Sequence, residues 1–460
     1  MRSVWLTQAM AADAAARITP LEGDLAVDVA IVGGGYTGLW TAIELKRRDP
    51  SLDVAVVERD VCGAGGSGAN AGFALPMWLQ VPALERAGGT DAALHVGRAS
   101  IEAIDDIRAL AGKPDNDIAM SSAPTVWAAT CEKQSGHWDD MLNLMEARQI
   151  HSFRLLGTDD IRSLTGSDAL VAGVVDTASA TLHPGHLVRA LRREALSLEV
   201  RVLEKTAMTR LRRSTPPGVI TPRGTLTARK VVLALYGWSL SLPELRPALM
   251  VMVTDAAMTV PLPGLLDSLG LAGAPGFTDS RTFIESCRPT ADGRIVVTKS
   301  GGALPFGDRI DASLRRTRRS TRELRAIMAA YHPALADVAI EGTWCGPIDR
   351  SRDGLPMFGH LGSSPDIVFG CGYSGAGIVP SRVGSHILAS LVQERDDAWS
   401  RSPLVGQPER AFPREPFRWI GGHAVRAAIE RKDRLDHEGR EPGPLTRFWL
   451  RFKPVSYKPA

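Results

Sequence analysis

The sequence has few cysteines, few aromatic residues and no long apolar run. Five cysteines are scattered over 460 residues, without the spacing of a metal site or a disulfide framework. This usage favours reduced thiols and a cytoplasmic protein. No stretch is long and apolar enough to span a bilayer. Residues 1–16 hold one arginine and no sustained apolar core, so we expect no secretory signal.

The sequence also lacks a strong excess of charge of either sign. A net charge of +3 gives no reason to expect a nucleic-acid partner or a membrane partner. With 44% hydrophobic and 23% charged residues, the composition is that of an ordinary globular protein. The length predicts two or three domains, one of which can be discontinuous. The oligomeric state stays open.

Glycine is abundant, and one glycine-rich segment carries a nucleotide-binding pattern. The apolar run 28–32 leads into Gly33-Gly-Gly-Tyr-Thr-Gly38, a helix is expected over 39–48, and a second apolar run ends at Glu58. In this pattern Gly33 permits the tight turn, Gly35 admits a pyrophosphate, and Gly38 allows close helix–strand packing. The helix N-terminus offers free N–H groups to phosphates.

The acid that ends the second run completes the pattern. Glu58 follows Gly33 by about 25 residues, near the usual spacing of about 20, and can accept hydrogen bonds from a ribose diol. The order strand, glycine turn, helix, strand and acid predicts dinucleotide binding. The alternative is a glycine-rich turn without a ligand.

Two later segments repeat the glycine signal. Cys62–Phe73 contains five glycines, which suggests close backbone approach to a ligand. The run 367–371 leads into Gly372-Tyr-Ser-Gly-Ala-Gly377, and a helix is expected over 379–393. The chain therefore leaves its nucleotide domain and returns to it twice.

The remaining elements are predicted from periodicity and turn signals. We expect helices over 7–16, 84–110, 138–148, 187–195, 313–331 and 420–435, and strands over 123–129, 169–178, 199–203, 218–221, 225–228, 230–235, 249–261, 282–287 and 294–299. The strands after 245 suggest an antiparallel sheet with a turn at 291–293. The tail beyond 415 is expected to pack across the nucleotide domain or a partner subunit.

Together these segments resemble the D-amino-acid oxidase-type family of FAD-dependent amine oxidoreductases, and most of all its γ-glutamylputrescine oxidase branch. The resemblance covers about residues 20–395. Besides the segments above, it rests on His183-Pro184, residues 231–238, Trp344-Cys-Gly346 and Asp353-Gly-Leu-Pro356.

The resemblance implies an α/β fold, in which a Rossmann-like FAD-binding domain carries an inserted α+β substrate domain with a mixed or antiparallel sheet. The implied boundaries are a leader at 1–26, a FAD-binding domain at 27–115, 170–240 and 343–395, a substrate-binding domain at 116–169 and 241–342, and a C-terminal helical extension at 396–460.

The resemblance also implies which residues meet the cofactor. Those assigned to FAD are Gly33, Gly35, Tyr36, Thr37, Gly38, Glu58, Arg59, Ser67, Gly68, Ala69, Asn70, Met208, Cys345, Gly346, Gly372, Tyr373, Ser374, Gly375 and Gly377. Met208 would meet the adenine. The dipole of the last helix would stabilise the anionic reduced flavin.

The implied activity is oxidation of the C–N bond of a small amine or amino acid to an imine, by hydride transfer to flavin N5 and with O2 as acceptor. The alternatives are a flavin dehydrogenase that passes electrons to a quinone or carrier protein, and a flavin-binding protein without turnover.

Two residues have open roles. Sarcosine-oxidase-like relatives activate oxygen with a lysine on a comparable strand, and Lys299 lies a few residues from the aligned position. The alternative is a solvated strand-end lysine. Cys345 either forms a thioether to the flavin, as in covalent relatives, or packs as a small hydrophobe. Here it lies eight residues before Asp353, against seven in those relatives.

Arginines are the candidates for substrate recognition, because a guanidinium pairs a carboxylate or phosphonate bidentately. The candidates are Arg288, Arg350 and Arg352. Ser286 replaces the aromatic residue that often precedes the substrate-domain arginine, and the arginine of the usual Gly-Arg-Asn-Gly-Gly is replaced in Gly68–Gly72. These departures leave the substrate open and the cofactor unchanged.

Overall fold

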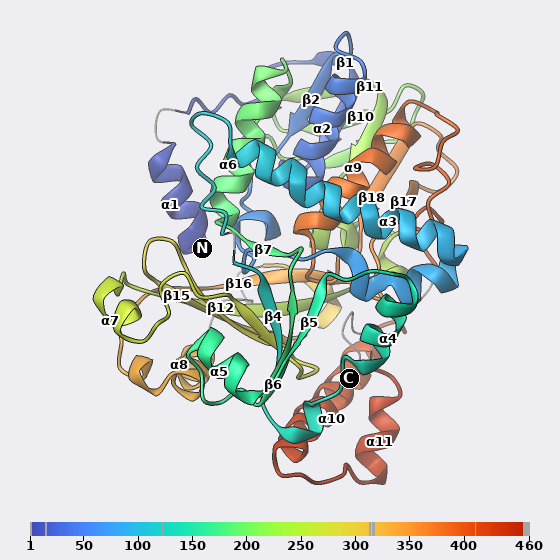
Figure 1. Ribbon diagram of the computed structural model, residues 1–460. Helices are drawn as coiled ribbons and strands as arrows, with labels where there is room; N and C mark the ends of the chain where they lie inside the picture. Colours follow the sequence, from blue (N-terminus) through green and yellow to red (C-terminus); the bar gives the residue numbers. More distant parts are fainter. Residues whose placement is uncertain are drawn as a thin grey trace.

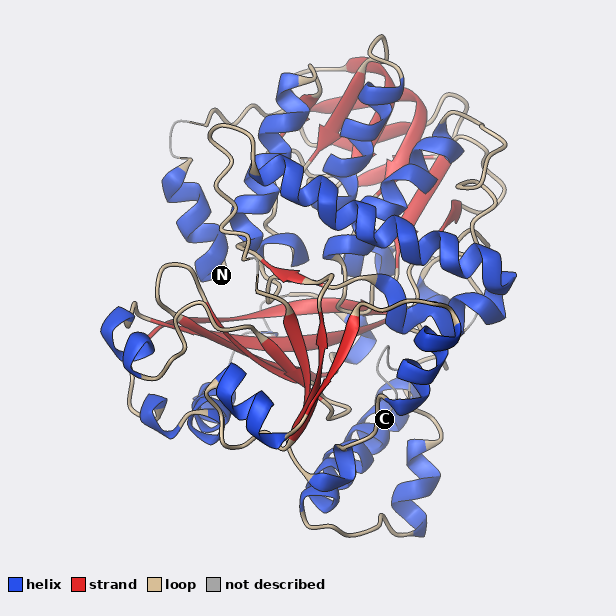
Figure 2. Ribbon diagram, viewed as in Figure 1, coloured by secondary structure: helices blue, strands red, loops and turns tan. Residues whose placement is uncertain are grey.

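Two eight-stranded sheets organise the chain in the computed structural model (Figures 1 and 2). The structure describes residues 2–13, 16–121, 123–311, 314, 318–409 and 411–453. A two-stranded sheet of β3 (Phe73–Ala74) and β7 (Ala180–Thr181) accompanies them.

The first sheet is largely parallel, in the order β17-β18-β11-β1-β2-β8. Its strands are β1 (Leu25–Val32), β2 (Val54–Val57), β8 (Arg201–Leu203), β11 (Gly224–Leu233), β17 (Met357–His360) and β18 (Ile367–Cys371), with β9 (Arg210–Arg212) and β10 (Gly218–Thr221) attached to β11. β1, β2, β8, β11 and β18 pair in parallel, whereas β17 and the β9–β10 extension are antiparallel. The continuous burial of residues 29–32 of β1 and of all of β2 is typical of a parallel sheet covered on both faces.

Helices cover one face of this sheet. They are α2 (Tyr36–Arg48), α3 (Val81–Ala111), α6 (Pro184–Ser197) and α9 (Ile378–Val392), which Figure 1 shows in front of the strands. Their apolar side chains join those of β1 and β2 in one core that includes Ile31, Leu39, Val56 and Ile387. This domain therefore has the predicted Rossmann-like form.

The second sheet has the order β16-β12-β15-β14-β13-β4-β6-β5 and is antiparallel except between β13 and β4. Its strands are β4 (Thr125–Ala129), β5 (Phe153–Leu156), β6 (Ala172–Asp176), β12 (Met250–Thr259), β13 (Phe277–Asp279), β14 (Glu285–Pro289), β15 (Ile295–Ala303) and β16 (Ile340–Arg350). Helices α4 (Asp139–Ala147), α5 (Thr158–Thr165), α7 (Pro263–Ser268) and α8 (Arg318–Tyr331) accompany it. The predicted fold class, with an inserted mixed sheet, is confirmed.

Two of the predicted domain boundaries are wrong. The strand at 172–176 pairs with β4 and β5, so the chain re-enters the nucleotide domain after 176 and not at 170. β16 pairs with β12 along its length, so the last return follows 350 and not 343. Both errors arise because a strand pairs according to its neighbours in space, which local sequence does not reveal.

The two ends of the chain form helices outside these sheets. α1 (Val4–Ala12) packs beside α6, while residues 14 and 15 of the predicted leader helix lie outside the described residues. α10 (Phe417–His437) and α11 (Pro444–Leu450) lie beside the second sheet, at the opposite end of the molecule from β1 and β2 (Figure 1). The expectation that the tail packs across the nucleotide domain is therefore wrong, whereas packing against a partner subunit stays a prediction. Within the described residues, the helices lack the combination of length and apolarity that a bilayer span requires.

Candidate active site

A cavity of about 440 Å³ lies between the carboxyl ends of β1 and β2 and one face of the second sheet. This volume falls in the range of about 300–1,000 Å³ typical of cofactor and small-molecule sites. All three glycine-rich segments contribute to its wall, together with β12, β14 and β15. The topology thus brings together segments that are more than 300 residues apart.

The first glycine turn is shaped by close backbone approach. Gly33 has φ +117°, and a Cβ there would collide with the Ala234 carbonyl oxygen. A Cβ at Gly35 would lie 2.8 Å from Ser67 Oγ, and one at Gly38 would collide with the Gly33 carbonyl. Gly33 and Gly35 line the cavity, whereas Gly38 lies behind them and sets the distance between α2 and β1.

The N-terminus of α2 faces this turn. Helix α2, described throughout, has Gly35 as its N-cap residue, no side-chain cap and no acid in its first turn. Ser67 Oγ accepts a hydrogen bond from the Tyr36 N–H at 2.9 Å. The positive end of the helix dipole and its remaining N–H groups therefore suit an anionic group.

Glu58, Arg59 and Met208 line the end of the cavity nearest β2. The Glu58 carboxylate accepts hydrogen bonds from the Gly34 N–H at 2.9 Å and the Asp60 N–H at 3.0 Å. Burial raises the pKa of this carboxyl. The Arg59 guanidinium lies 3.9 Å from the centroid of the Trp238 ring, which is a cation–π contact within the wall. The sequence analysis did not predict that Trp238 lines this site.

The second glycine segment is braced by Asn70. Its amide donates to the Ser67 carbonyl at 2.9 Å and to the Gly66 carbonyl at 3.2 Å, and its oxygen accepts from the Gly72 N–H at 2.8 Å. Asn70, Ser67 and Ala69 line the cavity. The segment therefore presents mainly backbone and small side chains to a ligand.

The Asp349 side chain holds the third glycine segment through a backbone N–H group. This buried carboxyl accepts from the Gly372 N–H at 2.6 Å, and its Oδ1 has no hydrogen-bond partner in the described structure. Burial raises its pKa to about 8. Tyr373 accepts a hydrogen bond from the Thr37 hydroxyl at 2.7 Å, which joins this segment to α2.

Most of the predicted cofactor residues line this one cavity: Gly33, Gly35, Tyr36, Thr37, Glu58, Arg59, Ser67, Ala69, Asn70, Met208, Gly346, Tyr373, Ser374, Gly375 and Gly377. Gly68 and Gly372 lie just behind the wall. A Cβ at Gly68 would collide with the Gly63 carbonyl, so this glycine shapes the turn.

Lys299 lies on the other face of β15. Its neighbours Thr298 and Ser300 line the cavity, whereas the Lys299 ammonium lies 3.5 Å from the Glu285 carboxylate. Because successive side chains of a strand point to opposite faces, Lys299 cannot share the wall with both neighbours. The oxygen-activating alternative does not match this position.

Arg288 and Cys345 also lie off the cavity wall. The buried Arg288 guanidinium donates to the Ala71 carbonyl at 2.7 Å and to the Leu182 carbonyl at 2.8 Å. Burial lowers its pKa to about 10. The Cys345 thiol donates to the Leu314 carbonyl at 2.8 Å, while the next residue, Gly346, lines the cavity. This placement favours the noncovalent alternative for Cys345.

Of the three arginine candidates, Arg350 lines the cavity. Its Nη1 donates to the Ser374 carbonyl at 3.4 Å. Arg352 is exposed. The Phe73 ring also lines the cavity, whereas the Trp127 ring belongs to the core.

The end of the cavity against the second sheet is lined by hydroxyls and apolar groups, of which the sequence had singled out only Ser286. These residues are Met252, Thr254, Thr278, Thr282, Phe283, Ile284, Ser286, Thr298, Ser300 and Ile429. Ser286 and Thr298 share a hydrogen bond of 2.6 Å. Strand alternation could have grouped Ser286, Thr298 and Ser300, but nothing local connects Ile429 to them.

Glu58, Arg59 and Arg350 are the charged side chains that line the cavity in the part of the chain that the structure describes. No pair of side chains at the second-sheet end, among those described, can pass a proton between an acid and a base. The wall can therefore bind and orient a ligand, and the chemistry depends on a bound cofactor.

Comparison with known proteins agrees with this geometry. A sequence model of the DAO family, described as FAD dependent oxidoreductase, matches residues 28–391. The γ-glutamylputrescine oxidoreductase of Escherichia coli strain K12 is 27% identical over 431 residues, which cover 90% of this chain and 95% of that protein.

Solved structures share the fold. Glycine oxidase from Geobacillus kaustophilus superposes with a TM-score of 0.68 at 21% identity, over 85% of this chain and all of that one. L-proline dehydrogenase from P. horikoshii gives a TM-score of 0.66 at 17% identity, over 81% of this chain and 94% of that one. The shared fold thus occurs in proteins named as an oxidase and as a dehydrogenase.

Proposed function

Because the chain belongs to the DAO family of FAD-dependent oxidoreductases, we propose that it oxidises the C–N bond of a small amine or amino acid to an imine, with O2 as the acceptor. One observation carries the proposal: a single cavity joins a dinucleotide-type cradle to a hydroxyl-rich, mainly uncharged end. The γ-glutamylputrescine oxidoreductase and glycine oxidase relatives support an amine substrate.

The residues of the cradle fit FAD. The Gly33–Gly35 turn and the open N-terminus of α2 would hold the pyrophosphate, since any larger side chain would collide there. Glu58 has lone pairs left for a ribose diol after it accepts two N–H groups. Met208 would meet the adenine. Gly346 and the 372–377 segment would border the flavin ring.

When bound, FAD supplies the redox chemistry by accepting the hydride of the substrate carbon. The protein's part is to bind the amine uncharged, because only the free base carries the lone pair that drives hydride loss. At the second-sheet end, no carboxylate lines the described wall, so an ammonium ion would have no counter-ion there. Burial without a counter-charge favours the neutral amine.

Arg350 is the cation that we assign to an anionic group of the substrate. It is the lining arginine of the 372–377 side of the cavity, where Ser374 accepts from it. The planar fork of a guanidinium matches the two oxygens of a carboxylate, which supports this assignment. The proposed compartment is the cytoplasm, since all five cysteines are free.

A panel of amines and amino acids, mixed anaerobically with the flavin-loaded protein, tests the proposal. We expect the flavin absorbance near 450 nm to bleach with at least one small amine, and to recover when air is admitted. Bleaching followed by slow recovery in air would identify a dehydrogenase that uses a quinone or carrier protein. If no amine or amino acid bleaches the flavin, the enzyme proposal fails and a binding protein remains.

A further inference from the structure

The C-terminal helix α10 supplies part of the cavity wall. Ile429, at the middle of this helix, lines the cavity and is 4% exposed. The match to the family ends at residue 391, whereas α10 begins at Phe417. This part of the wall therefore lies outside the residues that the family model matches.

Ile429 belongs to a small apolar cluster that forms part of the cavity wall. Phe283 and Val425 are buried with it, and Met252, Trp449 and Leu450 pack against them. Phe283 and Met252 also line the cavity. The cluster thus joins β12, the 280–284 loop, α10 and α11 at one point.

The 280–284 loop is held from two sides. On one side, Asp433 of α10 accepts hydrogen bonds from the N–H groups of Thr282 at 3.3 Å and Phe283 at 3.5 Å. On the other side, Arg281 donates to buried Asp279 at 2.7 Å and to the Tyr331 hydroxyl at 3.2 Å. The loop therefore presents Thr282, Phe283 and Ile284 to the cavity in a fixed orientation.

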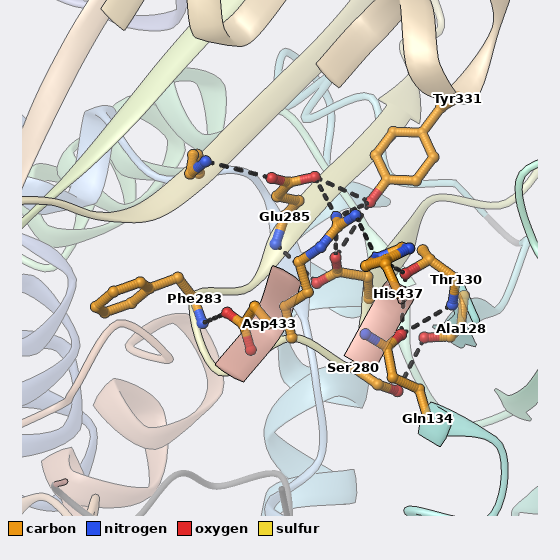
Figure 3. Close-up of polar contacts among 12 residues, drawn as sticks. Ala128, Thr130, Gln134, Ser280, Phe283, Glu285, Tyr331, Asp433 and His437 are labelled. Atoms are coloured by element: carbon orange, nitrogen blue, oxygen red, sulfur yellow. Dashed lines mark hydrogen bonds and ion pairs between the residues drawn. The ribbon is translucent and has the colours of Figure 1, made fainter. Parts of the chain in front are cut away.

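The contacts of Arg281 extend to the end of α10. Its Nη2 lies 2.9 Å from His437 Nε2, and it pairs with Glu285. Because arginine only donates, the His437 ring nitrogen accepts and the imidazole is neutral. Figure 3 shows Glu285, Tyr331 and His437 converging on this point, with Asp433 beside Phe283. Two contacts of α10 thus fix the loop that faces its own Ile429.

The described residues that line this end of the cavity carry no charge but include two hydroxyls without a partner. Met252, Thr254, Thr282, Phe283 and Ile429 line it. The Thr254 and Thr282 hydroxyls are buried and have no hydrogen-bond partner in the described residues. A buried hydroxyl without a partner is costly, so these two groups suit a ligand that supplies one. A charged group would be desolvated here without a counter-ion.

We propose that α10 and the 280–284 loop form a distal subsite that binds the uncharged tail of the substrate, with Ile429 and Phe283 setting its length and Thr254 and Thr282 binding a polar group of that tail. This inference rests on the proposed amine oxidation for the identity of the substrate's reactive end. The subsite itself excludes a second ammonium or carboxylate at the far end of the substrate.

Straight-chain primary amines from ethylamine to octylamine, mixed with flavin-loaded protein, test whether Ile429 limits the length of the substrate tail. Dissociation constants come from ligand-induced changes in the flavin absorbance, and oxidation comes from anaerobic bleaching. In the wild type, affinity should rise to an optimum length and then fall. In Ile429→Ala the optimum should move to longer chains, and an amine two methylenes longer should bind about tenfold tighter than in the wild type.

Two further variants keep the test decisive. Ile429→Phe should move the optimum to shorter chains, which a loss of stability alone would not do. Ile420→Ala changes an exposed residue of the same helix, 56% exposed, and should leave the optimum unchanged. The same optimum chain length in the wild type and all three variants would overturn the subsite. Failure of every amine to bind the wild type would also overturn it.

The polar part is tested with Thr282→Val, which replaces the hydroxyl by a methyl group. The variant should lose about tenfold in its preference for an ω-hydroxyalkylamine over the alkylamine of equal length. An unchanged preference overturns the role of Thr282. A shifted binding optimum without bleaching would support the subsite and refute the amine oxidation, whereas bleaching with an unmoved optimum would do the reverse.

Discussion

The two halves of the cavity are built from different parts of the polypeptide. The half beside β1 and β2 is made of backbone: glycine turns, a helix N-terminus and N–H groups held by Glu58 and Asn70. The half beside the second sheet is made of side chains from β12, β14, β15, a loop and α10. A backbone-built site tolerates little change, whereas a side-chain wall can be altered residue by residue. We therefore expect the first half to govern the cofactor and the second half the substrate.

The sharpest way to break the backbone half is Gly35→Val. The added Cβ would lie 2.8 Å from Ser67 Oγ, and its methyl groups would fill the path of the pyrophosphate. We expect FAD affinity to fall at least about a hundredfold, about 2.8 kcal/mol, so that the protein purifies without flavin. The ratio of flavin to protein absorbance measures this.

Gly264→Ala is the matched control, since no atom lies within 4 Å of a Cβ placed there. It should retain the wild-type flavin content. A Gly35→Val protein with one flavin per chain would contradict the assignment of this turn to the pyrophosphate.

A smaller and pH-dependent effect is expected at Asp349, the side chain beneath the third glycine segment. Its pKa is about 8 in the folded protein, against about 3.9 in an unfolded chain. Between these values the folded state keeps a proton that the unfolded state has lost. The contribution of Asp349 to stability is therefore fully present below about pH 4 and is lost as the pH rises to 8. The slope is at most about 1.4 kcal/mol per pH unit.

Asp349→Asn removes the titratable carboxyl group but keeps a side-chain oxygen that can accept the hydrogen bond from the Gly372 N–H. The stability of the variant relative to the wild type should therefore grow from pH 5 to pH 8, as measured by urea denaturation at several pH values. The raised pKa of Asp176 is common to both proteins and cancels in the comparison. Parallel pH curves would mean that Asp349 is ionised in the fold.

The smallest effect is expected for Lys299→Met. The lysine lies on the far face of β15, is 34% exposed, and pairs with Glu285 at 3.5 Å, an ion pair worth about 1 kcal/mol or less. The rate of flavin reoxidation by air should change less than about twofold, because the side chain does not reach the cavity.

Thr298→Val, one residue away and facing the cavity, is the control for Lys299→Met, and it should alter kcat/KM for the substrate. A hundredfold loss of the oxygen reaction in Lys299→Met would restore the oxygen-activating alternative. Stopped-flow mixing of reduced protein with oxygenated buffer measures both variants.

The sequence was sufficient for the backbone half because each of its parts is local. Strand, glycine turn, helix, strand and Glu58 occur within about thirty residues, and glycine at Gly33 and Gly35 has a physical reason that needs no knowledge of distant neighbours. The same holds for most helices and strands, whose periodicity is contained in the elements themselves.

The side-chain half could not be predicted in the same way. Choosing Lys299 in place of Thr298 depends on which face of β15 meets the cavity, and this parity is fixed by pairing with β12 and β14. Ile429 joins Phe283 across almost 150 residues of sequence. The domain boundary at 170 failed for the same reason, since β6 takes its sheet from β4 and β5.

Arg288 has a consequence for how molecules enter and leave. It extends from β14 of the second sheet and donates to two carbonyls on the nucleotide side, while its guanidinium lies 5.0 Å from the centroid of the buried Trp5 ring. Parting the two sheets would break both hydrogen bonds and expose the Trp5 ring to water, so this side chain opposes a hinged opening of the domains. We therefore expect the two sheets to keep their relative position while substrate and product exchange.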